Sequence, residues 1–416
     1  MTFPASVIRK LAPSEEWYAQ SVTYGATTLY LSGPFDVDAM TIAFDALLES
    51  HPMLSGHLEP AGDSGHQIVT DDLMHPGIWL VPEGGEIMPG AGGFELDPGV
   101  SLINLMVRPG DGRAEVALFV HHSIADGNHA AGLLFELFTR YTEAVRSGDP
   151  GPIVAQPAPE PLETVLTQRG LGKRPRSGLE RFMPAMFAHQ LPPPRVPAQL
   201  DDPTRPAQAP TGRGRLSQAE TTAVMEFGRA HRLFLNPLVS AAILLAEWQI
   251  RDTPGIPIPY VYVVDLRMLL DPPVPLTSAT NPLGMATYLA AITRDTTLVG
   301  LARDIAENFQ SDLADGVVQQ SMLHFKPQYD QGPRGLPDVV SSTNFGRTPV
   351  LPTPPDLRVD DWRSDIYRAS TTIDMYTVGI FGDQLAIEHH TYAPEAQRSV
   401  DVVLSILATA AREHQR

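Results

Sequence analysis

Apolar and polar residues alternate along this chain with two different periods, and together they predict a mixed α+β protein. Runs in which apolar residues alternate with polar ones, or cluster between turn residues, predict strands. The strongest such runs lie at 27–33, 102–109, 114–122, 258–267, 285–293, 338–345, 370–382 and 384–392. Shorter runs at 57–60, 66–71 and 77–83 predict shorter strands.

Other segments repeat their apolar residues every three or four positions, which predicts helices. One helix starts at Asp36 or Asp38 and is closed by His51-Pro52, and a longer one follows Asp126-Gly127 and ends before SGDPGP at 147–152. Ser217 with Glu220 has the spacing of a capping box, so we expect a helix to begin there. Further helices are expected at 236–251, 296–314 and 394–414.

A proline-rich stretch near mid-chain suggests where two domains meet. The segment 191–210 contains seven prolines, which favour an extended linker over a regular element. A chain of 416 residues is also too long for one ordinary core. We therefore expect an N-terminal domain at 1–190, a linker at 191–211 and a C-terminal domain at 212–416.

Composition narrows the classes of function. The net charge is −18, so binding to nucleic acid is not expected. The chain has no cysteine, which excludes disulfides and a thiolate nucleophile. The N-terminus shows no long apolar segment, and the apolar run 238–246 is too short to span a bilayer. We expect a soluble cytoplasmic monomer, and leave open a peripheral contact with the inner face of the membrane.

Two adjacent histidines carry the clearest chemical signal. His121 and His122 end a predicted strand, and Asp126-Gly127 follows, which gives the pattern H-H-x-x-x-D-G before a helix. A neutral imidazole at a strand end can act as a base at cellular pH. The aspartate can cap the helix or hold a cation, and the glycine permits a turn. The alternative is a pair of core histidines with no chemistry.

This motif resembles the signature of the condensation-domain and acyltransferase superfamily. That superfamily includes peptide-synthetase condensation domains, plant alcohol acyltransferases and chloramphenicol acetyltransferase. Nearly the whole chain is similar to the polyketide-associated acyltransferases of mycobacteria, in segments such as SVIRKLAPSEEWYAQ, DVDAMTIAFDALLESHPML and IPYVYVVDLR. The resemblance implies two similar chloramphenicol-acetyltransferase-like domains joined by a crossover, with the active-site channel between them.

The resemblance also implies roles for particular residues. His122 matches the catalytic base, supported by His121 and Gly127. Asp126 matches a structural aspartate that pairs with an arginine of the other domain, for which Arg267 is the best candidate; a surface salt bridge is the alternative for Arg267. SSTNFGRT at 341–348 and ATNPLG at 279–284 resemble channel segments, so Ser342, Asn344 and Asn281 are oxyanion or channel candidates. Plant enzymes carry Asp-Phe-Gly-Trp-Gly at the former segment, and a turn or plain loop is the alternative for both.

The implied activity is O-acyl transfer. A long fatty or polyketide acyl group would pass from a thioester, on carrier-protein phosphopantetheine or coenzyme A, to the hydroxyl of a lipid alcohol or diol. No bound cofactor and no metal are expected. An acyl-loaded synthase or carrier protein is the expected partner, docked on Arg229 and Arg232. The denser basic run 169–181 is expected to be solvated and mobile.

Two rival functions remain open from the residues alone. The first is a condensation enzyme of the same superfamily that acylates an amine and forms an amide. The second is a non-catalytic scaffold that binds a synthase or a lipid in the same channel. The intact histidine motif argues against the scaffold, because such a protein does not need His122.

Overall fold

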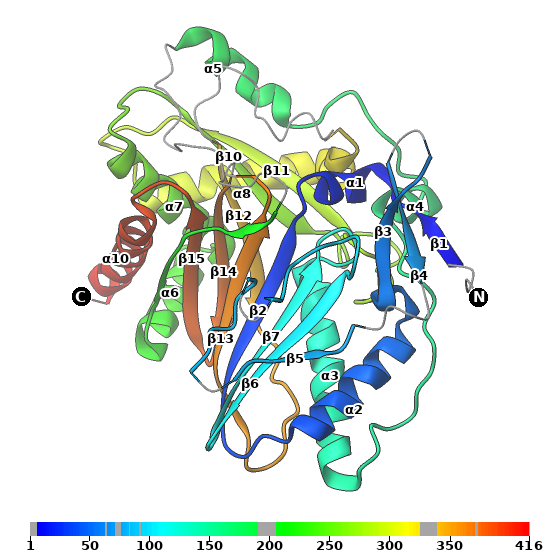
Figure 1. Cartoon of the computed structure of the whole chain (residues 1–416). Coiled ribbons are helices and arrows are strands. Elements are labelled where there is room, and N and C mark those ends of the chain that lie inside the picture. The colour runs from blue at the N-terminus through cyan, green and yellow to red at the C-terminus, as the bar shows by residue number, and fades with distance from the viewer. Residues whose placement is uncertain are drawn as a thin grey trace.

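The computed structural model describes residues 6–62, 65–70, 76–82, 84–90, 93–189, 205–324, 339–370 and 373–415, and these form two large sheets with helices packed on them (Figure 1). The helices are α1 Pro13–Gln20, α2 Val37–Ser50, α3 Gly127–Ser147, α4 Leu162–Gln168, α5 Met183–Ala188, α6 Gln218–Ala230, α7 Leu235–Arg251, α8 Leu298–Ala314, α9 Val317–Gln320 and α10 Ala396–His414. The strands are β1 Ser6–Lys10, β2 Tyr24–Ser32, β3 Gly56–Pro60, β4 His66–Thr70, β5 Ile78–Leu80, β6 Ile103–Gly110, β7 Arg113–His121, β8 Ala207–Gln208, β9 Thr211–Arg215, β10 Ile258–Asp265, β11 Leu283–Ala290, β12 Val340–Arg347, β13 Arg358–Arg368, β14 Asp374–Phe381 and β15 Gln384–Thr391. The mixed α+β class predicted from the sequence is confirmed.

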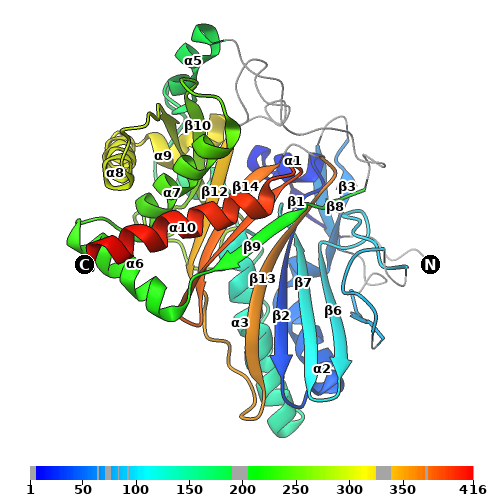
Figure 2. The ribbon, with the colours of Figure 1, turned by 90° about the vertical axis from the view of Figure 1, so that its left-hand side faces the viewer.

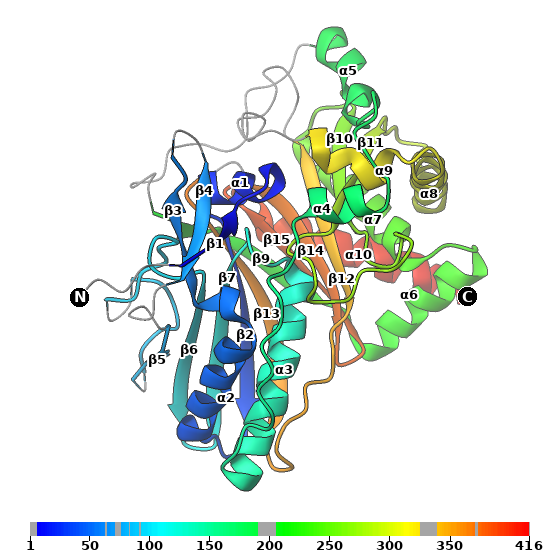
Figure 3. The ribbon, with the colours of Figure 1, turned by 90° about the vertical axis from the view of Figure 1, so that its right-hand side faces the viewer.

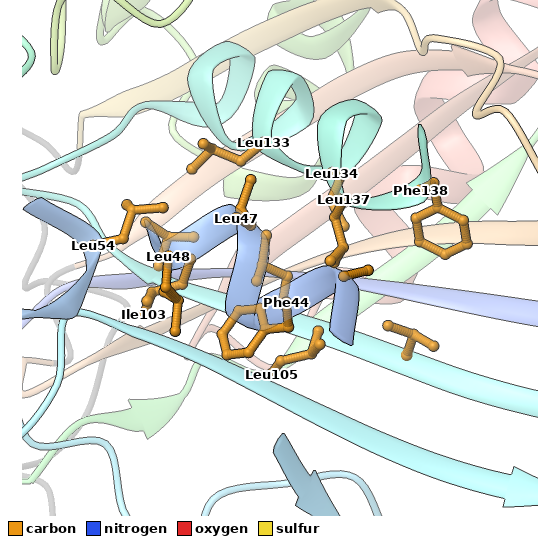
Figure 4. Close-up of a cluster of buried hydrophobic side chains, with 14 of the residues drawn as sticks. Phe44, Leu47, Leu48, Leu54, Ile103, Leu105, Leu133, Leu134, Leu137 and Phe138 are labelled. Atoms are coloured by element: carbon orange, nitrogen blue, oxygen red, sulfur yellow. The ribbon is translucent and has the colours of Figure 1, made fainter. Parts of the chain in front are cut away.

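The first large sheet has the strand order β5-β6-β7-β2-β13-β8. Helices α2 and α3 cover one of its faces (Figure 3). Leucine and phenylalanine side chains from both helices interlock there with Ile103 and Leu105 of β6 (Figure 4). This packing fixes the end of β7 against the start of α3, which is where the histidine motif lies.

The second large sheet has the order β11-β10-β12-β14-β15-β9. Helices α6, α7, α8 and α10 bury their apolar residues against it in a second core. The predicted caps are confirmed: the Asp36 side chain accepts from the Ala39 N–H at the start of α2, and Ser217 and Glu220 form the capping box of α6. In the described part of the chain no single helix is long and apolar enough to cross a membrane, although α6 and α7, bent by 105°, pass that test as a pair.

The chain crosses between the two sheets at their shared border. Strand β8 belongs to the first sheet and β9, three residues later, to the second, while β13 returns from the second half of the chain to pair with β2 (Figure 2). Arg213 of β9 pairs with Asp365 of β13 across this border. The domain boundaries at 190 and 212 stay a prediction. The structure shows in addition that β13, from the second half of the chain, pairs with the first sheet. Most of the proposed linker, residues 190–204, lies outside the described residues.

No apolar pattern predicts β13. Its sequence, RVDDWRSDIYR, is rich in charge: Asp361 and Asp365 pair with arginines of β9, and Arg363 pairs with Asp361 on the same strand. Strand β1, helix α1 and the short helices α4, α5 and α9 were not expected either. Helix α1 packs where a third core meets β10 and β11, so a segment with little periodicity of its own helps to build the site.

Candidate active site

The histidine motif lies where β7 ends and α3 begins. His121 is the last residue of β7 and pairs with Tyr24 of β2, so its position is fixed by the sheet. The His122 N–H donates to the Thr23 carbonyl at 2.8 Å, which holds the first residue of the turn. Asp126 is the N-cap of α3, since its side chain accepts from the His129 N–H at 2.8 Å. The motif is therefore a rigid strand-turn-helix joint.

The two adjacent histidines occupy different environments. His121 is fully buried, and its Nδ1 lies 2.7 Å from the Ser123 hydroxyl; burial lowers the pKa of His121 to about 3. His122 is a partly exposed residue, and its ring stacks on that of Tyr18 with ring centroids 4.1 Å apart. Its Nδ1 is buried without a hydrogen bond of standard geometry, so Nε2 is the ring nitrogen left open.

The charge state of His122 follows from the same surroundings. Burial lowers the pKa of His122 below its usual value of 6.5, while Asp126 and hydrogen bonding act in the opposite direction. A neutral imidazole has one ring nitrogen without a proton and can accept one. Only His122 of the pair combines this neutral state with an accessible nitrogen, whereas His121 is a core residue.

Asp126 forms a buried ion pair with Arg267 from the second half of the chain. The guanidinium donates from Nη1 to Oδ2 at 2.8 Å and from Nη2 to Oδ1 at 3.0 Å, and both side chains are under 5% exposed, at 4% and 3%. Arg267 also donates to the Leu276 carbonyl and to Asp265. The predicted contact is present, and it is a bidentate, desolvated pair and not a surface salt bridge.

The segment 279–281 crosses from the second half of the chain and reaches the motif directly. The Asp126 N–H donates to the Thr280 carbonyl at 3.0 Å, and the Asn281 side-chain amide donates to the His122 carbonyl at 2.8 Å. Asn281 is therefore brought to the site as predicted. Its amide nitrogen holds the backbone of the turn, which makes it a support for His122.

Ser342 and Asn344 are not brought to the motif. Both lie on the face of β12 that meets α7: the Ser342 hydroxyl is 2.5 Å from the Tyr260 hydroxyl, and the Asn344 amide donates to Asn236. Strand side chains alternate between faces, so the neighbour Phe345 points the other way. Phe345, not the two polar candidates, contacts the motif at Gly127.

The structure corrects the expected role of Gly127. This residue is not in the left-handed region that requires glycine, and it is the first residue of α3. A Cβ at Gly127 would overlap the Phe345 ring. The glycine is needed because the two halves of the chain approach closely there, not because the chain turns.

Gly127→Ala is therefore expected to lower stability by about 1–3 kcal/mol, the usual cost of overpacking a core. Phe345 must move to admit the methyl group, so Gly127→Ala with Phe345→Leu should regain part of that loss. Chemical denaturation of the three variants checks this. If Gly127→Ala is as stable as the wild type, the close approach of Phe345 is not what requires glycine.

Much of the basic run 169–181 is exposed, as expected of a solvated run, but several of its arginines make defined contacts. Arg169 donates to the Pro272 carbonyl, Arg174 to the Asp315 carbonyl, and Arg181 forms two hydrogen bonds with the buried Asp312 of α8. These contacts hold the run against the second half of the chain. Arg229 and Arg232, by contrast, are exposed at the turn between α6 and α7, beside the 84% exposed side chain of Phe234.

One group of side chains in the described residues has the spacing of a metal site. Ligand atoms of Glu247, Asp374 and His389 lie within 4.8 Å of one another. Arg251 pairs with both carboxylates, at 2.8 and 3.5 Å, so one guanidinium already offsets part of their negative charge. The group lies in the second core between α7 and the sheet and is separate from the histidine motif.

Two cavities in the described part of the chain lie away from His122. One, of about 310 Å³, is lined by Tyr30, Arg108 and Arg363 on the open face of the first sheet. The other, of about 460 Å³, is lined by Val22, Leu96 and Arg205. Neither is lined by His122, so the channel between the halves stays a prediction.

Sequence reasoning missed two side chains that touch the motif. Tyr18 covers the His122 ring, and Phe345 covers Gly127. Neither residue has a spacing relation to 121–127. Phe345 could have been found from its alternation with Ser342 and Asn344, whereas Tyr18 reaches His122 only through tertiary packing.

Comparison with known proteins places this geometry in one family. A family model described as the C-terminus of phthiocerol/phthiodiolone dimycocerosyl transferase matches residues 205–390. Curated proteins named phthiocerol/phthiodiolone dimycocerosyl transferase are similar over their whole length, with 55% identity over 100% of both chains in Mycobacterium sp. (strain JLS). The Mycobacterium leprae relative is 46% identical over 99% of both chains.

Solved structures agree on the fold. Polyketide synthase associated protein 5 from Mycobacterium tuberculosis superposes with a TM-score of 0.90 at 46% identity, covering 99% of this chain and 100% of that one. A trichothecene 15-O-acetyltransferase from Fusarium sporotrichioides has a TM-score of 0.70 at 12% identity, over 96% and 95% of the chains, and shares the fold alone. With this identity over its full length, the chain belongs to the phthiocerol/phthiodiolone dimycocerosyl transferase family of acyltransferases.

Proposed function

We propose that this chain transfers a long fatty or polyketide acyl group, of the mycocerosyl kind, from a thioester to a hydroxyl of a lipid diol of the phthiocerol kind. The names of its full-length relatives support the substrate class. The observation that carries the proposal is the neutral, partly exposed imidazole of His122, held at a joint between the two halves of the chain.

His122 is the general base in this proposal. Its Nε2 takes the proton of the alcohol as the alcohol oxygen attacks the thioester carbonyl and forms the new C–O bond. The tetrahedral intermediate then expels the thiolate with cleavage of the C–S bond, and Nε2 returns the proton to the sulfur. Such catalysis contributes about 10²–10⁴-fold to the rate. No acyl-enzyme forms, which agrees with a chain that has no cysteine.

Asp126, Arg267 and Asn281 position the base and do not touch the reacting atoms. The ion pair and the amide contact tie the turn to the second half of the chain, and His121 and Gly127 pack behind it. Holding both substrates in a channel between residues 1–190 and 212–416 would supply the remaining acceleration. Ser342 and Asn344 are not oxyanion donors in this proposal, since they contact Tyr260 of β10 and Asn236 of α7.

We also propose that the thioester is presented by a carrier protein or synthase, with acyl-coenzyme A as the alternative donor. The exposed Arg229 and Arg232 would meet the acidic surface and the phosphate of a carrier. The chain would act as a monomer in the cytoplasm, reaching a lipid diol at the inner face of the membrane.

Charge reversal tests the carrier surface. Arg229→Glu and Arg232→Glu are expected to weaken use of a carrier-bound acyl group by about 10-fold, because like charges slow the encounter. Turnover of a small acyl-coenzyme A should change little. Arg303→Glu, an exposed arginine on α8, is the matched control and should affect neither donor. Equal losses with both donors, or with the control, contradict docking at this turn.

The bond that is formed distinguishes the proposal from its rivals. Purified protein is given an acyl thioester with a long-chain diol or with an amine of matched length. An ester that is cleaved by mild alkali is expected from the diol. An alkali-stable amide formed faster from the amine would favour a condensation enzyme, and no turnover with either acceptor would favour a scaffold.

A further inference from the structure

We infer that Tyr18 is a positioning residue for the catalytic base: its ring fixes the plane of the His122 imidazole and shields one face of it from water. This inference rests on the proposed role of His122. The two rings are stacked with centroids 4.1 Å apart and planes 16° from parallel. A stack of this kind leaves the imidazole free to use its edge, where Nε2 lies, but restricts rotation of the ring.

The backbone holds the two rings in register through a single residue. The Thr23 N–H donates to the Tyr18 carbonyl at 3.0 Å, and the Thr23 carbonyl accepts from the His122 N–H at 2.8 Å. Val22, the residue before Thr23, has a φ of 44°, which is a left-handed conformation that is unusual for a β-branched residue. Such strain persists only where surrounding contacts determine the backbone, and it is common beside functional groups.

The Glu15 side chain anchors α1 to the segment 279–281, which also holds the histidine motif. The fully buried Glu15 accepts two hydrogen bonds from Arg9, each 2.7 Å long, and one from the Thr280 hydroxyl at 2.7 Å. The Thr280 carbonyl in turn accepts the Asp126 N–H. Helix α1, which carries Tyr18, and the turn that carries His122 are thus both tied to Thr280, and this keeps the two rings in a fixed relation.

The ring of Tyr18, and not its hydroxyl, positions the imidazole. Burial raises the pKa of the Tyr18 hydroxyl above its usual value, so it stays neutral and cannot serve as a base. The charged and titratable groups near His122 are Asp126 of α3, Arg368 of β13, His121 of β7 and Tyr18 itself. Removing the Tyr18 ring would admit water to the imidazole and move the pKa of His122 toward 6.5.

Three variants test the inference: Tyr18→Phe, Tyr18→Leu and, as a matched control, Tyr288→Leu, another partly buried tyrosine on β11. Tyr18→Phe should keep kcat within about twofold of the wild type. Tyr18→Leu should lower kcat by about 10–100-fold with little change in KM, since a small misplacement of a catalytic group has this effect. The acidic limb of its pH profile should also move to higher pH.

A ring pKa measurement separates this inference from the proposed function. In NMR titration of labelled histidine, His122 should titrate below 6.5 in the wild type and at a higher pH in Tyr18→Leu, whatever the protein catalyses. A folded Tyr18→Leu with wild-type kcat and an unchanged His122 pKa overturns the inference. So does a Tyr18→Phe variant as impaired as Tyr18→Leu, which would assign the role to the hydroxyl. If His122→Ala stays active while the pKa shift is seen, the proposed base is wrong and the stacking is not.

Discussion

His122→Ala is expected to fold like the wild type and to lose about 3–5 kcal/mol of transition-state stabilisation, which is the contribution of a general base. His122 is partly exposed, and its Nδ1 makes no hydrogen bond of standard geometry in the described part of the chain, so the main contact that the substitution removes is the stack on Tyr18. The loss should fall on kcat and on kcat/KM alike. Steady-state kinetics, with circular dichroism as the check on folding, measures both.

The neighbouring histidine is the natural control. His121→Ala removes a fully buried ring that packs edge-on against Tyr24 at 4.8 Å, so it should lower the free energy of unfolding. The activity of the folded fraction should fall less than in His122→Ala. A folded His122→Ala protein with full activity would end the assignment of the base.

The pH dependence has a definite sign. The base works only when neutral, and burial lowers the pKa of His122, so activity should fall on acidification with an apparent pKa below 6.5. Wild-type activity should therefore be near its plateau at pH 7 and should not rise appreciably above it. A pH profile in which activity still rises well above pH 7 would mean that a group other than His122 controls the activity.

The second large effect concerns the ion pair between the two halves of the chain. Removing one partner of a buried pair leaves the other charge unpaired, at a cost of about 3–5 kcal/mol. Arg267→Ala should come close to this value. The unpaired charge should cost less stability in Asp126→Ala, because Asp265 still lies 3.1 Å from Arg267. This substitution also removes the N-cap of α3, which lowers stability by a second route.

Asp126→Asn separates the two contributions. Asparagine can keep the cap by accepting from the His129 N–H, but it does not neutralise Arg267. The double variant Asp126→Ala with Arg267→Ala should be less destabilised than the sum of the single variants, since the lost interaction is shared. Denaturant unfolding of the wild type, the two single alanine variants and the double variant gives the coupling energy.

An exposed pair supplies the matched control. Arg347 and Asp383 form an ion pair with both side chains more than half exposed, so Arg347→Ala should cost no more than about 1 kcal/mol. Strict additivity of Asp126 and Arg267 would contradict their pairing. An Asp126→Ala protein as stable as the wild type but inactive would make Asp126 a direct participant in the chemistry.

The sequence predicted those parts of the fold that have a strong local pattern. Strand β7, helix α3 and the N-caps of three helices could be read from apolar periodicity and from Asp36, Ser217 and Asp126. Strand β13 could not, because its charged residues pair across the border of two sheets and only tertiary contacts identify it as a strand. The same limit hid α1, whose anchor Glu15 is buried among residues far along the chain.

The residues of the candidate site could likewise be predicted only in part. His122, Asp126, Arg267 and Asn281 meet in the structure, as the family resemblance implied. Ser342 and Asn344 were chosen because their segment resembles a channel motif, but both lie on the face of β12 that meets α7, and Phe345 on the other face contacts the motif. A shift of one residue on a strand reverses the face, and register depends on the neighbouring strands.

The most direct test of the central claim is ester formation by the purified protein and its dependence on His122. Wild type, His122→Ala and Tyr288→Leu are each incubated with a long-chain acyl thioester and a long-chain diol, and the acyl ester is quantified by mass spectrometry. The wild type and Tyr288→Leu should form the ester, and His122→Ala should form it at least about 100-fold more slowly. Ester formation at the wild-type rate by folded His122→Ala would contradict the account.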